Sequence, residues 1–349
     1  MSLRLPNPLS AVVWLAFFLP AAAWGGWLDR AFGAAVALLG LAVLISKASP
    51  WEARKPSALA LRFFLILELL WIFSFLYSAA FKGAQFSPRG YFELTRYAIF
   101  GAFVVHLIRH YDARVRTAME WAMVAALYSA LIAPEIDPHG CAALLTLCWL
   151  LFFSRLRLRL AHVAAALVVV FFSDSLAAWT AALFVLGAAL AVASYRLLAR
   201  RRNKRAVAAS LALYLLLLGG AAAGSRLKPG AAAGVPAATA RPRALRLISR
   251  SPIFGWGAAD LEGVSTQENQ YVLWLLEGGV LGAAVILLGV LLAGYRLLSA
   301  ANADVVRLAG AAAFLAAVAM MLAAGPYLES SKLFFLTAFF MAGMREESR

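Results

Sequence analysis

Long apolar blocks alternate with short polar segments along almost the whole chain. A helix that crosses a membrane needs roughly 20 mostly apolar residues, and most of the blocks have about that length. The pattern predicts twelve membrane spans, at residues 10–27, 31–46, 57–80, 91–108, 115–133, 139–154, 159–172, 176–197, 207–224, 269–294, 305–325 and 329–344. The spans at 31–46, 139–154 and 159–172 are short, so they could be tilted, re-entrant or merged with a neighbour.

The composition favours a membrane protein over a soluble one. Hydrophobic residues make up 64% of the 349 positions and charged residues 14%, whereas soluble domains average roughly 45–50% and about 25%. No polar stretch is long enough to form a separate soluble domain. We therefore expect an all-α, polytopic transmembrane bundle, with about nine spans in 1–224, a loop at 225–268 and about three spans in 269–349.

The net charge of +15 gives the expected orientation. In a soluble chain this excess would suggest nucleic-acid binding, but in a membrane chain Lys and Arg are retained on the cytoplasmic side. With the N-terminus in the cytoplasm, the cytoplasmic connections and the two chain ends hold 20 of the 32 basic residues. We predict a multi-pass protein of the bacterial inner membrane with both termini in the cytoplasm. This topology requires the block at 10–27, so we do not expect a cleaved signal peptide.

One outer connection departs from this charge pattern. Residues 225–268 form a loop of about 44 residues that carries six basic side chains, Arg226, Lys228, Arg241, Arg243, Arg246 and Arg250. Long loops escape the positive-inside rule, and long loops often carry function. We therefore predict a functional loop on the periplasmic side.

The second part of this loop fits a short amphipathic helix. At 100° per residue, Arg243, Arg246 and Arg250 fall within about 60° of one another, while Leu245 points elsewhere. Pro252 is expected to end the helix. We predict that the helix lies at the membrane surface with its basic face exposed.

Three motifs around this helix carry a family resemblance. Pro-Ile-Phe-Gly-Trp-Gly stands at 252–257, Glu-Asn-Gln-Tyr at 268–271, and Leu-Glu-Gly-Gly-Val-Leu-Gly at 276–282. Over about residues 241–282 the sequence resembles the signature of the O-antigen ligase and polymerase superfamily. Outside this stretch the chain agrees with that family in layout, because many spans precede a large periplasmic loop and a few follow it. Ile136–Gly140 is weakly similar to another family segment.

The resemblance implies an enzyme that moves a glycan from undecaprenyl pyrophosphate to an acceptor hydroxyl on the periplasmic side. Such enzymes use no nucleotide sugar, and the ligases need no metal and no other cofactor. A ligase transfers the glycan to lipid A–core, whereas an O-antigen or exopolysaccharide polymerase transfers it to a second lipid-linked repeat. The loop motif favours the ligase, and the polymerase stays the alternative.

Arginines suit this chemistry because displacement of a pyrophosphate builds negative charge on the leaving group. Guanidinium groups bind phosphate oxygens through paired hydrogen bonds, and fixed positive charge lowers the barrier. We predict pyrophosphate binding by Arg243, Arg246 and Arg250, with Arg89 and Arg96 as further candidates from the outer turn before the fourth span. The alternatives are contact of the loop arginines with anionic lipid headgroups, and an ion pair of Arg96 with Glu93, three residues earlier on the same helix.

The acceptor hydroxyl needs a general base. Ligases of this family usually have His before the motif Asn, and here that position is Glu268. We predict Glu268 as the catalytic base; a carboxylate that favours a helix dipole is the structural alternative. Asn269 and Tyr271 are predicted to orient donor or acceptor, and His139 is a weaker candidate for the same role.

Other features argue against competing functions. There is no nucleotide-binding Gly-Lys loop, no His-Glu-x-x-His and no Gly-x-Ser-x-Gly, which removes support for ATP-driven transport, zinc proteolysis and serine hydrolysis. His106 and His110 have the spacing of a metal pair, but an interfacial role is expected. Gly278, Gly279 and Gly282 are expected to allow close helix packing. A flippase for a lipid-linked glycan remains the rival class; it should show an internal repeat, and none is evident.

Overall fold

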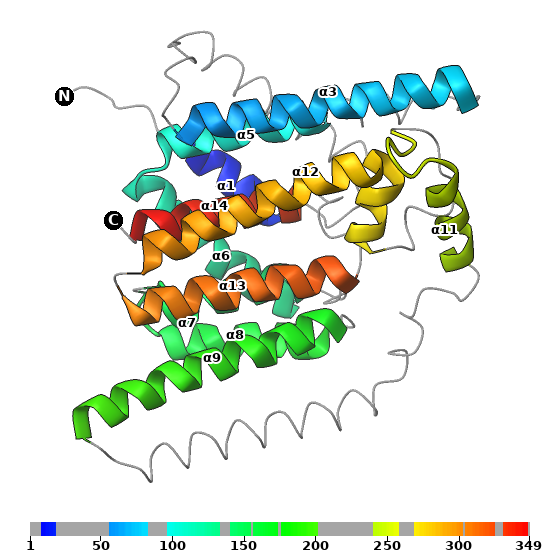
Figure 1. Ribbon diagram of the computed structural model, residues 1–349. Helices are drawn as coiled ribbons and strands as arrows, with labels where there is room; N and C mark the ends of the chain where they lie inside the picture. The colour runs from blue at the N-terminus through cyan, green and yellow to red at the C-terminus, as the bar shows by residue number, and fades with distance from the viewer. Residues whose placement is uncertain are drawn as a thin grey trace, which may run out of the picture. The chain divides into compact units, whose positions relative to one another are not determined.

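The computed structural model describes residues 8–18, 56–82, 96–132, 140–154, 156–173, 176–201, 240–257, 269–302, 304–324 and 331–347 (Figure 1). Every regular element in these ranges is an α-helix, and they contain no strand. The predicted all-α class is therefore confirmed for the described part of the chain. The predicted spans at 31–46 and 207–224 lie outside the described residues.

Five of the described helices are long and apolar enough to cross a membrane. They are α3 (Pro56–Lys82), α6 (Ala113–Ile132), α9 (Leu176–Arg201), α12 (Gln270–Ala301) and α13 (Val305–Ala324). This length and composition are those of membrane-spanning helices. Five shorter helices overlap predicted spans: α1 (Pro8–Phe18), α5 (Arg96–His110), α7 (Gly140–Phe152), α8 (Arg159–Phe172) and α14 (Ser331–Glu347).

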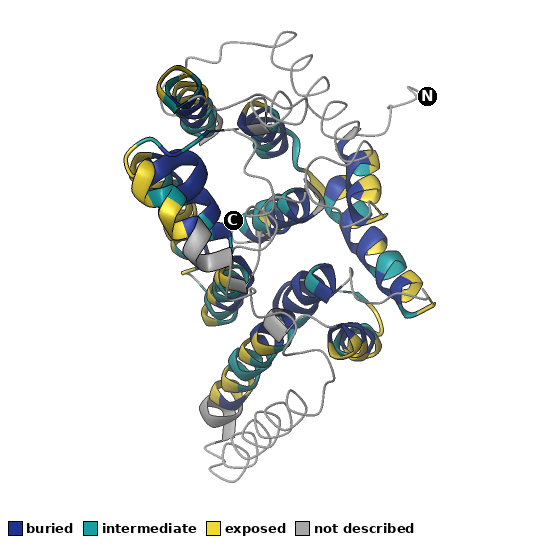
Figure 2. Cartoon of the chain, turned by 90° about the vertical axis from the view of Figure 1, so that its right-hand side faces the viewer, coloured by how far each residue is buried: buried dark blue, intermediate teal, exposed yellow. Residues whose placement is uncertain are grey.

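Large apolar side chains stand exposed along the long helices. On α3, Leu69, Phe73 and Leu76 are exposed, and on α12 Leu288 and Leu291 are exposed. Figure 2 shows helices with buried residues on one side and exposed residues on another. An exposed apolar surface of this extent is expected where lipid replaces water as the solvent.

The chain forms two compact units. The first contains Met1–Arg116, Pro236–Ala293 and Leu322–Ala342, and the second contains Thr117–Val235, Gly294–Met321 and Gly343–Arg349. The arginine-bearing loop motif and the first part of α12 belong to the first unit.

The core of the first unit is aromatic. Phe334 of α14 stacks on Phe100 of α5 with ring centroids 3.8 Å apart, and Phe335 lies 4.5 Å from Phe103. Helices α3 and α5 run side by side (Figure 1). A carboxylate oxygen of Glu68 on α3 accepts a hydrogen bond from the Ala98 N–H, 3.0 Å away, in the first turn of α5. A negative charge at a helix N-terminus is favourable, so this acid within the predicted span at 57–80 has a structural partner.

The second unit is built around α7, whose residues are buried on almost every side. Trp149 of α7 donates its indole N–H to the Glu120 carboxylate of α6 at 3.1 Å, and both side chains are buried. Glu120 thus faces protein rather than lipid, as a charged group inside a membrane requires.

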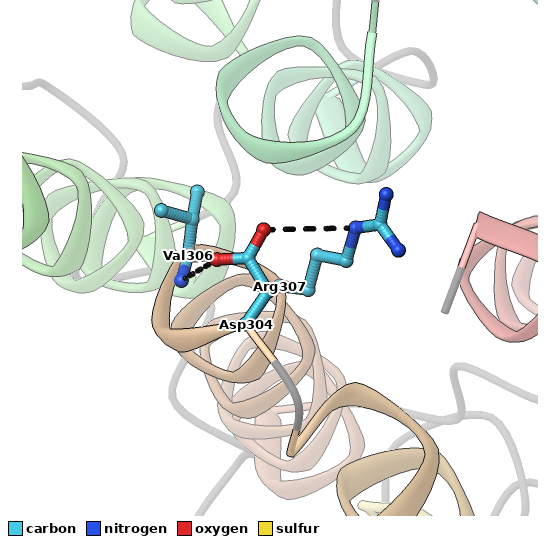
Figure 3. A network of polar contacts seen from close by, with 3 residues as sticks. All are labelled: Asp304, Val306 and Arg307. Atoms are coloured by element: carbon cyan, nitrogen blue, oxygen red, sulfur yellow. Dashed lines mark hydrogen bonds and ion pairs between the residues drawn. The ribbon is translucent and has the colours of Figure 1, made fainter. Parts of the chain in front are cut away.

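Helix α13 begins at a capped end. Asp304 accepts a hydrogen bond from the Val306 N–H at 2.8 Å through one carboxylate oxygen, and its other oxygen lies 3.8 Å from Nε of Arg307 (Figure 3). An aspartate cap satisfies an amide that has no partner within the helix. The cap explains why the helix starts at Val305, where the predicted span at 305–325 begins.

Candidate functional site

The predicted short helix of the long loop is present as α11 (Ala240–Arg250), which begins three residues before the predicted start at Arg243. One face of α11 is held by protein: Ala244 forms a buried cluster with Leu273 and Leu276 of α12, and Leu247 and Ile248 pack against it. Arg246 and Arg250 are exposed. The helix is therefore amphipathic as predicted, with its apolar side docked on the start of α12.

The stretch Ser251–Gly257 follows α11 and runs along α12. Four backbone hydrogen bonds join the two segments: Trp256 N–H to Leu276 O (2.8 Å), Gly257 N–H to Glu277 O (2.7 Å), Val280 N–H to Pro252 O (2.8 Å) and Leu281 N–H to Ile253 O (3.2 Å). We call Ser251–Gly257 the strap. The first and third sequence motifs are thus joined directly, although about twenty residues separate them in the chain.

The strap joins α12 at a break in that helix. Gly279 has φ 61° and ψ −164°, which is not helical and is open only to glycine at low cost. The expectation that Gly279 serves close helix packing is therefore wrong. Gly279 supplies a backbone conformation, and a Cβ on Gly282 would meet no described atom within 4 Å.

The strap also contacts α3. The hydroxyl groups of Ser78 and Ser251 both donate hydrogen bonds to the Gly255 carbonyl, the first at 3.2 Å. Gly257 has φ 64°, and a Cβ there would lie 2.5 Å from the Phe75 backbone nitrogen. The strap is therefore wedged between the backbones of α3 and α12, where a larger residue does not fit.

A lysine outside the three sequence motifs also belongs to this site. Nζ of Lys82, the last residue of α3, lies 4.8 Å from the Trp256 ring centroid and 5.1 Å from that of Tyr77. The nitrogen is buried and has no hydrogen-bond partner among the described residues. A lysine that ends an apolar span beside a tyrosine was the available signal, but its burial depends on Trp256, far away in the sequence.

Aromatic rings line the same end of α3. The ring centroid of Phe254 in the strap lies 5.0 Å from that of Phe73 and 5.3 Å from that of Tyr77. The ring centroids of Tyr77 and Phe81 are 5.0 Å apart. Phe73 and Phe81 are exposed. The exposed phenylalanine rings give this end of α3 an apolar surface beside the strap.

Asn269 has a structural role at the start of α12. Its side-chain oxygen accepts a hydrogen bond from the Val272 N–H at 3.0 Å, and its carbonyl accepts one from the Leu273 N–H at 3.1 Å. It is thus the N-cap of α12. Tyr271 is half-buried, and its ring lies 5.5 Å from that of Trp274 in an edge-to-face arrangement.

The structure places some of the predicted site residues and not others. Arg246, Arg250, Asn269 and Tyr271 all lie on α11 or at the start of α12, within the first unit. The backbones of Arg96 and Arg243 lie in α5 and α11, but their side chains lie outside the described part. Glu268, Arg89 and His139 are outside the described residues, so the predicted base stays a prediction.

Metal ligands do not gather in the described part of the chain. His106 and His110 have ring centroids 4.7 Å apart on α5, but no group of three or more His, Cys, Asp or Glu side chains occurs within the described ranges.

No protein-family model matches the chain, and no curated protein matches it.

Proposed function

We propose that the chain is a membrane glycosyltransferase that moves a glycan from undecaprenyl pyrophosphate to an acceptor hydroxyl on the periplasmic side, with lipid A–core as the acceptor. The observation that carries the proposal is the arginine helix α11, which the strap fastens to the break in α12. The sequence motifs that resemble O-antigen ligases are the segments that make these contacts. A twelve-span topology with cytoplasmic termini would put α11 outside the inner membrane.

The leaving group sets the electrostatic requirement. When the bond between the anomeric carbon and the phosphate oxygen breaks, undecaprenyl pyrophosphate keeps the electron pair and its negative charge grows. Exposed Arg246 and Arg250 can donate paired hydrogen bonds to phosphate oxygens, and the buried ammonium group of Lys82 adds positive charge on α3. Arg243, Arg89 and Arg96 are the further candidates for this role.

The attacking group requires a base. In the proposed reaction the Glu268 carboxylate takes the proton of the acceptor hydroxyl, the acceptor oxygen attacks the anomeric carbon, and the configuration inverts. Asn269, the next residue, caps α12. Tyr271 and His139 would orient the substrates, and the reaction uses neither a nucleotide nor a metal.

The donor is a lipid, so its tail must reach the site through the membrane. We propose that the undecaprenyl tail enters sideways between helices, where the exposed Phe73 and Phe81 offer an apolar surface near the strap. The glycan and pyrophosphate would then lie at the interface beside α11.

A repeat-unit polymerase is the second candidate. It shares the donor and the leaving group and differs in its acceptor, which is another lipid-linked repeat. The specific observation in its favour is Glu268, because ligases of the resembled family usually have His at that position.

Reconstitution tests the proposal. The purified protein in lipid nanodiscs receives an undecaprenyl-pyrophosphate-linked glycan with either lipid A–core or a second lipid-linked repeat, without nucleotide. A new glycosidic bond on lipid A–core is expected, and elongation of the lipid-linked repeat alone would favour the polymerase. Movement of the donor across the bilayer without bond formation would identify a flippase instead.

An arginine variant links the activity to α11. The double change Arg246→Gln and Arg250→Gln should abolish most of the transfer, because two charge-assisted contacts are lost. Arg157→Gln is the matched control, since Arg157 is an exposed arginine of the second unit. Equal transfer by both variants would contradict the assignment of the arginines.

A further inference from the structure

Trp256 makes three contacts, through its backbone N–H, its indole N–H and the face of its ring. Its backbone N–H donates to Leu276 O of α12 at 2.8 Å, and its indole N–H donates to Leu247 O of α11 at 2.9 Å. Nζ of Lys82 on α3 lies over the face of its ring, 4.8 Å from the ring centroid. One residue of the strap therefore touches the helix with the break, the arginine helix and the buried lysine.

We propose that Trp256 is a positioning residue that holds Lys82 and α11 in a fixed relation, so that a pyrophosphate meets cations that are already arranged. This inference rests on the proposed function. The pyrophosphate would contact Lys82 and the arginines, while Trp256 acts through them.

The geometry of the indole supports this role. Its N–H donates to the Leu247 carbonyl while its ring face meets the lysine, so one side chain contacts both Lys82 and the backbone of α11. Arg246 directly precedes Leu247, and Arg250 follows one turn later. Cations on two separate helices are thus joined through one side chain.

The state of Lys82 points to an anion. A buried ammonium group without a hydrogen-bond acceptor is costly, and ring faces compensate only part of that cost through cation–π attraction. Nζ is buried with no hydrogen-bond partner among the described residues, beside Trp256 and Tyr77. An incoming phosphate oxygen would supply the missing acceptor.

The backbone of Trp256 is itself fixed. The carbonyl of the preceding residue, Gly255, accepts hydrogen bonds from Ser78 of α3 and from Ser251. The following residue, Gly257, lies against the Phe75 backbone. A tryptophan that only anchored the protein at the membrane interface would need none of these backbone contacts. They hold the backbone on both sides of Trp256 in place.

Trp256→Phe is the decisive variant, because phenylalanine keeps a ring near Lys82 and loses only the N–H donor. Trp179→Phe is the matched control. Its indole N–H also donates to a backbone carbonyl, that of Phe171, at 3.0 Å, but it lies in the second unit. Two quantities are measured in nanodiscs: donor kcat and KM in the transfer assay, and amide hydrogen exchange of residues 244–250.

Loss of one hydrogen bond should loosen α11 without unfolding the protein. For Trp256→Phe we expect roughly three- to tenfold faster exchange over 244–250 and a similar rise in donor KM. The control should leave both quantities at the wild-type values. Wild-type exchange over 244–250 together with a wild-type donor KM in Trp256→Phe would overturn the inference.

A second variant covers the case in which Trp256→Phe does not accumulate. Ser78→Ala removes one hydrogen bond from Gly255 and leaves the tryptophan in place, so a smaller change in the same direction is expected, and no change in exchange or KM would also overturn the inference. The two proposals fail separately. Absence of transfer by the wild type refutes the proposed function, whereas the exchange measurement tests the link between Trp256 and α11 without any turnover.

Discussion

The backbones of Gly255 in the strap and Gly279 in α12 are in direct contact. A Cβ on Gly255 would be 2.5 Å from the backbone nitrogen of Gly279, and a Cβ on Gly279 would be 2.5 Å from the backbone nitrogen of Gly255. Both residues have positive φ, 67° and 61°. Each glycine therefore allows the close approach of the other, and neither position has room for a side chain.

Gly279→Ala should destabilise the protein by about 2–4 kcal/mol, because alanine adds both left-handed strain and a backbone clash. Thermal unfolding in detergent, followed by tryptophan fluorescence, measures the change. Gly282→Ala is the matched control in the same helix, since a Cβ there meets no described atom within 4 Å. Equal unfolding temperatures for the two variants would contradict the contact between strap and helix.

Arg250→Lys separates charge from geometry at the proposed pyrophosphate site. Lysine keeps the positive charge but cannot donate two parallel hydrogen bonds. We expect kcat/KM for the donor to fall about tenfold for Arg250→Lys and about a hundredfold for Arg250→Gln. Arg157→Lys serves as the control. If lysine restored full activity, charge alone would be sufficient and paired hydrogen bonding would be excluded.

Glu268→Gln should lower kcat by roughly 10²- to 10⁴-fold, because glutamine cannot accept the hydroxyl proton. Glu268→His should retain part of the turnover, since imidazole is the usual base of the resembled family. The initial rate of transfer at saturating donor measures both, with Glu346→Gln, at the exposed C-terminal end, as the acidic control. Near-normal turnover by the glutamine variant would remove Glu268 as the base.

Side-specific labelling tests the topology. A cysteine at Ala232, in a background without Cys141 and Cys148, should react with a membrane-impermeant maleimide from the periplasmic side. A cysteine at Asn203, in the basic segment after α9, should react only after the membrane is opened. Labelling of Ala232→Cys from the cytosol would place the loop on the wrong side for a periplasmic transferase.

Hydropathy located most of the helices well, because burial in lipid depends on average polarity over about 20 residues. The predicted span at 159–172 coincides with α8, and the predicted loop helix coincides with the C-terminal eight residues of α11. The end of α12 was predicted at 294 but lies at Ala301. Its last residues, with Arg296, are more polar, and hydropathy marks where an apolar segment ends rather than where helical hydrogen bonding ends.

The contacts of the site were harder to predict. The motif residues on both sides of the loop were found, but not that Ser251–Gly257 binds α12 at Gly279. A positive φ leaves no trace in hydropathy, and two glycines in an apolar helix equally suggest helix packing. Lys82 was missed for a related reason, because its burial comes from Trp256, a contact between residues distant in sequence.

The break at Gly279 divides α12 into two helical segments with different contacts. The shorter segment, residues 270–278, packs against α11, and its carbonyls accept hydrogen bonds from the strap. The longer segment, residues 280–301, continues as the apolar helix. Backbone hydrogen bonds thus link residues 251–257 to residues 276–281, which are distant in the sequence. For the proposed transferase, residues 240–281 are therefore the segment to exchange between proteins of this architecture when acceptor preference is to be altered.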